Sequence, residues 1–136
     1  MLNHKLSRKA QLFLLGALLG VAIFLLMYGT APLNVANDAF CRGGYIEKDI
    51  QQHYAGWLFY KRSAIGWPLG VTDAVNYPGG VSVAYTDSIP LLAALCRPLA
   101  AALGGTFQYF GWFTLVCFAS VSYTHLRAHE TDSYLV

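Results

Sequence analysis

The sequence has 136 residues, enough for one small domain, and 56% of them are hydrophobic while only 12% are charged. Soluble domains average about 25% charged residues, so this composition favours a membrane protein. The net charge of +2, without a basic patch that aromatic residues interrupt, argues against nucleic-acid binding. The three cysteines form no CxxC pair and have no metal-ligand spacing.

A short basic segment, residues 1–9, precedes an uncharged apolar run at residues 10–28. As a helix this run would be about 28 Å long, close to the thickness of a bilayer's hydrocarbon core, so it predicts a first transmembrane helix. Basic residues before the helix predict a cytoplasmic N-terminus and an external loop after it. A cleaved signal peptide is the alternative, but its apolar region usually has about 7–15 residues, so we favour an uncleaved anchor.

Residues 29–87 are predicted to form the external loop, with an interfacial helix at about 46–60 and a Gly- and Pro-rich, mostly irregular stretch at 63–85. Three polar residues fall within one turn of that helix: Asp49, Gln52 and His53. Such a set could hold a metal ion, orient a hydroxyl group or abstract a proton. The alternative is a water-facing side that any interfacial helix needs, with Asp49 as a cap.

Aromatic residues are frequent in and after this helix. Trp and Tyr are enriched where a membrane meets water. We therefore expect four of them to be interface anchors rather than substrate-stacking platforms: Tyr54, Trp57, Phe59 and Trp67.

Two further apolar runs, residues 88–103 and 106–121, predict a second transmembrane helix and an incomplete third one. Asp87, just before the second helix, could cap it or bind a metal ion or a phosphate-bound cation. Arg97 would lie deep in the bilayer, where a charge must face protein or water, so it is a functional candidate. The alternatives for Arg97 are snorkelling to the surface or pairing with an acid on another helix. Pro98 predicts a kink near Arg97.

The terminal segment, residues 122–136, changes abruptly to polar residues and resembles a sequence that recurs at the ends of unrelated metagenome-derived proteins. We therefore expect it to be an assembly artefact. His125 and His129 could share a helix face next to Glu130, but two histidines and one acid are too weak a pattern to predict a metal site.

Four motifs occur in a defined order: DxxQHxxGWxFY, GWPLG, YPGGxSVxYTDSIPLLA and FQYFGW. In this order and spacing, over residues 49–117, they resemble domain of unknown function 6311, an uncharacterised group of bacterial multi-pass membrane proteins. That group is similar to the GT-C glycosyltransferases, which use sugars linked to polyprenyl phosphate. The resemblance implies an all-α fold, the N-terminal fragment of a polytopic GT-C-like protein in the bacterial inner membrane, with residues 29–87 in the periplasm.

The resemblance also implies a function: transfer of a sugar from a polyprenyl-phosphate donor in the membrane to an envelope glycan, lipid or protein. Asp49 would be the catalytic base, or would bind a divalent ion such as Mg²⁺ or Mn²⁺, with Asp87 as a second candidate ligand. The other implied contacts, to substrate or donor phosphate, come from Gln52, His53 and Arg97.

Two features depart from the family pattern. Residues 59–62 read FYKR where an FFR-like end of the helix is expected, and the spans after the third are missing, which predicts that this chain alone is inactive. The alternative function is that of a non-enzymatic membrane protein, such as a flippase, transporter component or assembly subunit for envelope glycans. The sequence does not predict an oligomeric state.

Overall fold

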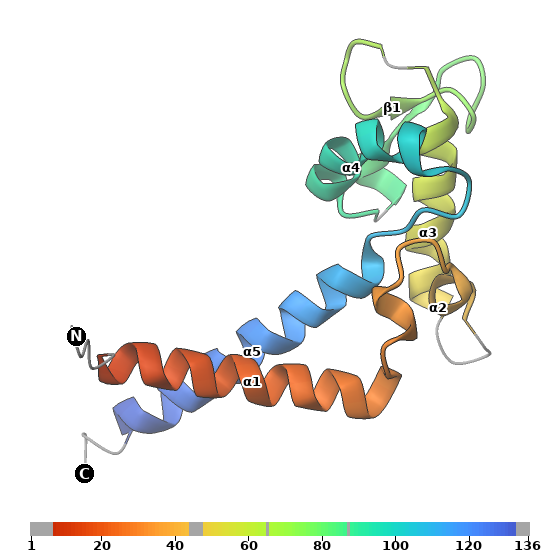
Figure 1. Ribbon diagram of the computed structural model, residues 1–136. Coiled ribbons are helices and arrows are strands. Elements are labelled where there is room, and N and C mark those ends of the chain that lie inside the picture. The colour runs from red at the N-terminus through yellow and green to blue at the C-terminus, as the bar shows by residue number, and fades with distance from the viewer. Residues whose placement is uncertain (1–6, 44–47, 65, 87, 133–136) are drawn as a thin grey trace, which may run out of the picture. The chain divides into compact units, whose positions relative to one another are not determined.

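The computed structural model describes residues 7–132 except 44–47, 65 and 87, and the chain divides into two compact units (Figure 1). Unit 1 combines residues 1–31 with residues 112–136, and unit 2 comprises Pro32–Gly111. The elements follow in the order α1 (Arg8–Tyr28), η1 (Ala31–Leu33), α2 (Ala39–Arg42), α3 (Lys48–Arg62), β1 (Val71–Thr72), β2 (Val81–Ser82), η2 (Val83–Thr86), α4 (Pro90–Leu103) and α5 (Phe110–Asp132). The described chain is therefore mostly helical, in agreement with the predicted class.

Helix α1 confirms the predicted helix at residues 10–28. The hydroxyl of Ser7 accepts a hydrogen bond from the backbone N–H of Ala10 and caps the helix, and Gly29 ends it with a φ of 69°. Among the described residues, Ala10–Tyr28 is the one helical segment long and apolar enough to cross a membrane. These features are compatible with membrane association, and a signal sequence near an N-terminus shares them.

Within unit 1, α1 packs closely on α5 through small residues. A Cβ atom on Gly16 would lie 2.6 Å from the Cα of Tyr123, and one on Gly20 would lie 2.3 Å from the carbonyl oxygen of Phe118. Glycines at such a helix interface let two backbones approach each other. The ring of Phe24 is fully buried and meets the ring of Phe118 edge to face.

The helix that contains the third apolar run continues past the end of that run near Val121. Helix α5 runs without interruption to Asp132, and it begins at Phe110 rather than at residue 106. The sequence from residue 112 to 132 contains no glycine or proline, so nothing in it stops a helix when the residues become polar. Tyr123, beyond the predicted end, provides part of the contact with Gly16.

Unit 2 is built around α3, which begins and ends two residues later than the predicted helix at 46–60. The side chain of Trp57 is completely buried, and its indole N–H donates a hydrogen bond of 2.9 Å to the carbonyl oxygen of Phe107. Tyr54 and Tyr60 are buried on the same helix, and Tyr109 meets the Trp57 ring edge to face at 5.0 Å. This aromatic cluster is the core of the unit.

The prediction that Tyr54 and Trp57 are interface anchors is therefore wrong, because both rings are buried inside the unit, Trp57 against Tyr109 and Tyr54 against Phe110. Phe59 and Trp67 remain exposed, Trp67 to 88% of its surface. For these two residues the anchoring role stays a prediction.

The stretch predicted to be mostly irregular contains a small hairpin. Strands β1 and β2 are antiparallel, with Val71 opposite Ser82 and Thr72 opposite Val81. The turn between them closes with a hydrogen bond from the N–H of Gly80 to the carbonyl oxygen of Asn76, and η2 follows directly.

Helix α4 is shorter than the second predicted transmembrane helix, residues 88–103. Its 14 residues are continuous through Pro98, and a helix of that length is about 21 Å long, less than the roughly 30 Å of a bilayer core. It begins after Ile89, whose φ is 52°, and ends at Gly104, whose φ is 88°. The second and third spans therefore stay predictions.

The buried position of Trp57 gives a first testable prediction. Trp57→Ala removes a large core side chain and leaves the Phe107 carbonyl without its donor, which should lower the free energy of unfolding by about 3–5 kcal/mol. Thermal or denaturant unfolding of the detergent-solubilised protein measures this change.

Trp67→Ala is the matched control, since it removes the same type of side chain from an exposed position. We expect its unfolding free energy to remain within about 0.5 kcal/mol of the original protein. Equal losses in the two variants would contradict the assignment of Trp57 to the core.

Candidate functional site

The first turns of α3 hold three of the predicted site residues. Asp49 and Gln52 are exposed, and His53 is half buried one turn after Asp49. A carboxylate in the first turn of a helix also interacts favourably with the helix dipole, so Asp49 has a stabilising role in addition to any chemical one. The structure thus brings these three residues to one end of one helix, as the sequence predicted.

His53 has an unusual feature. Its Nδ1 atom is buried, and no described residue forms a hydrogen bond with it. A buried polar atom without a partner costs about 1–3 kcal/mol, so such an atom in a folded protein calls for an explanation. A bound ligand or a role in proton transfer would provide one.

Arg97 is separated from these residues. It lies on α4 with 6% of its surface exposed, stacks on the ring of Tyr60 at 4.5 Å, and donates a hydrogen bond from Nη2 to the carbonyl oxygen of Ser63. Tyr60 follows His53 by seven residues, or about 10 Å along α3. The guanidinium group therefore holds α4 against the C-terminal half of α3. The other predicted residue, Asp87, lies outside the described residues.

No group of three or more His, Cys, Asp and Glu residues that could hold a metal ion occurs in the described part of the chain. Mg²⁺ is often held by one or two carboxylates together with substrate phosphate, so Asp49 fits a site that is completed by the donor. A divalent ion at Asp49 or Asp87 therefore stays a prediction.

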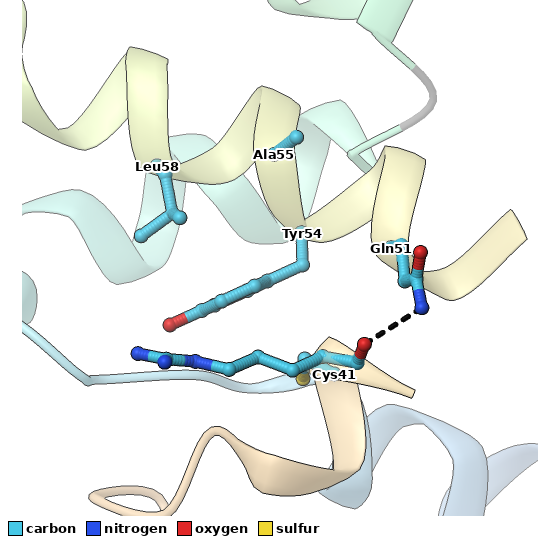
Figure 2. A pocket seen from close by; sticks show the side chains of 6 residues that line it. Cys41, Gln51, Tyr54, Ala55 and Leu58 are labelled. Atoms are coloured by element: carbon cyan, nitrogen blue, oxygen red, sulfur yellow. Dashed lines mark hydrogen bonds between the residues drawn. The ribbon is translucent and has the colours of Figure 1, made fainter. Parts of the chain in front are cut away.

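Sequence reasoning missed a pocket between α2 and α3. It has a volume of about 250 Å³ and is lined by Cys41, Arg42, Gln51, Tyr54, Ala55 and Leu58. Figure 2 shows Cys41 on α2, facing the side chains that α3 contributes. The amide of Gln51 donates a hydrogen bond of 2.7 Å to the carbonyl oxygen of Arg42, which links the two helices at the edge of the pocket.

A carboxylate next to this pocket organises its polar groups. One oxygen of Asp38 accepts hydrogen bonds from Arg42 Nε at 2.9 Å and from the hydroxyl of Tyr54 at 2.8 Å. The i,i+4 spacing of Asp38 and Arg42 was visible in the sequence. The contribution of Tyr54, 16 residues further on, was not.

The network also determines which groups are ionised. Burial alone would raise the pKa of Asp38, but the hydrogen bonds from Tyr54 and Arg42 outweigh it and hold that pKa below its usual value. Burial, followed by the nearby charge of Asp38, raises the pKa of the Cys41 thiol to about 12. Burial and the hydrogen bond to Asp38 also raise the pKa of Tyr54. At neutral pH, Cys41 and Tyr54 are thus protonated, so the pocket offers a binding surface rather than a nucleophile.

A family model for a domain of unknown function, DUF6311, matches residues 17–130. The chain belongs to the DUF6311 family. The match covers parts of both units. It also includes residues 122–130, most of the terminal segment that we expected to be an assembly artefact. No significant match was found among curated proteins or among solved structures.

The pKa of Asp38 predicts how the stability of this DUF6311 chain depends on pH. Because the folded-state pKa is lowered, the contribution of Asp38 is complete above the unfolded value of about 3.9 and is lost as the pH falls through the folded value. Denaturant unfolding should therefore show that the original protein loses its stability advantage over Asp38→Asn below about pH 4.

Tyr54→Phe provides the matched comparison, since it removes one hydrogen bond to Asp38 and keeps the ring. The folded-state pKa of Asp38 should rise toward its unfolded value in this variant, so the contribution of Asp38 should be smaller and its loss should be complete at a higher pH. A parallel pH dependence in all three proteins would show that Asp38 is not held in this network.

Proposed function

We propose that this DUF6311 chain is part of a bacterial inner-membrane glycosyltransferase of the GT-C type. The enzyme transfers a sugar from a polyprenyl-phosphate donor to an envelope glycan, lipid or protein on the periplasmic side. The observation that carries the proposal is an exposed carboxylate, Asp49, within one turn of His53, whose buried Nδ1 has no partner among the described residues. The candidate span before unit 2 and the resemblance of the motifs to this enzyme class support it.

Sugar transfer of this kind needs a base and a means of stabilising a phosphate leaving group. The oxygen of the acceptor hydroxyl attacks the anomeric carbon while the bond from that carbon to the phosphate oxygen breaks. Asp49 takes the proton of the hydroxyl, and the phosphate leaves with the bonding electrons. A divalent ion, when bound, would neutralise charge on that phosphate.

The other predicted residues have different parts in the proposal. Gln52 and His53 lie within about one turn of Asp49 on α3, and in this proposal they orient the acceptor or the donor phosphate. Asp87 is kept as a second ligand for the cation. Arg97 contributes through position, by holding α4 against α3, because its guanidinium group is already engaged by Ser63 and Tyr60.

The experiment is a transfer assay on membranes that contain the complete product of the gene. The donors are radiolabelled hexoses linked to undecaprenyl phosphate, supplied as a panel, and incorporation into envelope material is counted. Asp49→Asn keeps the shape of the side chain but removes the base, so transfer should fall by about 10²-fold or more.

Asp73→Asn is the control, because Asp73 is also an exposed acid of unit 2 but lies in the hairpin turn. It should transfer sugar at the original rate. Full activity of Asp49→Asn would remove Asp49 from catalysis. Absence of transfer in every protein, with envelope glycan export still dependent on the gene, would favour the non-enzymatic alternative of a flippase or transporter component.

A further inference from the structure

Helix α4 presents an apolar surface to its surroundings. Four leucines, spaced four residues apart and therefore on one side of the helix, are between 54% and 73% exposed: Leu91, Leu95, Leu99 and Leu103. The other positions of the helix that the structure describes as exposed are Pro90, Ala94, Pro98 and Ala102. This outer face of α4, defined by these eight residues, carries no charged or polar side chain.

The opposite side of α4 holds the helix's one charge. Ala93 and Ala100 are buried there against the core of unit 2, and Arg97 is buried between them in sequence. The guanidinium group of Arg97 is covered by the ring of Tyr60 and bonded to a carbonyl oxygen of the unit. In a surface helix of a soluble protein, apolar residues face the core and charged residues face water. In helix α4 the one charge faces the core instead, and the outward side is apolar.

We propose that the outer face of α4 lies in the hydrocarbon of the bilayer and that α4 is an interfacial helix that does not cross it. A helix in lipid must turn its charges toward protein, which is how Arg97 is placed. The outer face carries no charge, as a surface in contact with hydrocarbon requires. The inference rests on the membrane attachment contained in the proposed function, and it does not depend on sugar transfer.

The chain also keeps unit 2 close to a bilayer. Unit 2 begins at Pro32, four residues after Tyr28, where the candidate span ends. Four residues extend at most about 14 Å, so a bilayer that holds the span is within reach of the unit. The short connection thus makes lipid an apolar phase that this surface can reach.

The composition of the outer face favours lipid over a protein partner. The centres of protein interfaces are enriched in aromatic residues, Met and Arg and contain hydrogen bonds. The outer face has only Leu, Ala and Pro. The length of α4, about 21 Å, and its ends at Ile89 and Gly104 argue for a helix that lies along the boundary rather than through it.

Spin labels on the outer face test the inference. The full chain is reconstituted in vesicles of phosphatidylcholine and phosphatidylglycerol, and single cysteines for labelling are introduced as Leu91→Cys, Leu95→Cys and Leu99→Cys. Collision rates with oxygen, which concentrates in hydrocarbon, and with a water-soluble nickel chelate are then measured by electron paramagnetic resonance. Asp73→Cys, in the exposed hairpin turn, is the matched control for a water-facing position.

The native cysteines must not take the label. Cys96 and Cys117 are partly exposed and are replaced by alanine. Cys41 can stay, because its thiol is buried and its pKa is raised to about 12, which leaves almost no reactive thiolate at neutral pH.

We expect the ratio of oxygen to nickel collisions to exceed one, and to be similar, at all three leucine positions, and to fall below one at Asp73. Ratios below one at the leucines would overturn the proposal, since the face would then be in water. Labels that neither reagent reaches would overturn it in favour of a protein partner. Ratios that peak at Leu95 and fall at both ends would indicate a helix that crosses the bilayer. Each result is independent of the transfer activity of Asp49→Asn.

Discussion

The structure of unit 2 depends on the burial of Trp57 and on the hydrogen bond from its indole to the carbonyl oxygen of Phe107. A tryptophan can be fully buried only where its N–H finds an acceptor, and here the acceptor lies 50 residues further along the chain. This contact brings the segment after α4 against α3 and closes the unit. The neighbouring tyrosines on α3 provide contacts to two other elements of the unit. Tyr60 provides the surface on which Arg97 of α4 stacks, and Tyr54 donates to Asp38, next to α2.

A second buried polar group holds the two ends of unit 2 together. The side-chain amide of Gln108 is fully buried and donates to the carbonyl oxygen of Pro32 at 2.8 Å, while its oxygen accepts the N–H of Gly111 at 3.0 Å. A Cβ atom on Gly111 would lie 1.9 Å from the Pro32 carbonyl oxygen, so only glycine fits there. The chain thus enters and leaves unit 2 at one place, and this contact closes the unit that carries Asp49 and His53.

Sequence reasoning succeeded where a local pattern was enough. A 19-residue run without charge predicted α1, and a stretch with polar residues one turn apart predicted α3 to within two residues at each end. It failed where the surroundings of a side chain depend on residues far away in the sequence. An aromatic residue on a helix has the same sequence pattern whether it faces a membrane interface or a protein core, so Trp57 was assigned to the wrong surroundings. Arg97 was predicted to face protein or water, but its actual partners, a carbonyl oxygen and an aromatic ring, leave no signal in the sequence. The pocket between α2 and α3 was missed for the same reason, since Tyr54 and Asp38 meet only after folding.

The claim on which the whole account depends is that α1 stays in the chain and holds unit 2 at a membrane. Alkaline carbonate extraction of cell membranes, followed by intact-mass analysis of the protein, tests it most directly. We predict that the protein stays in the extracted membrane pellet with a mass that includes residues 10–28. A soluble protein whose mass shows that these residues have been removed would identify α1 as a cleaved signal sequence and contradict the account.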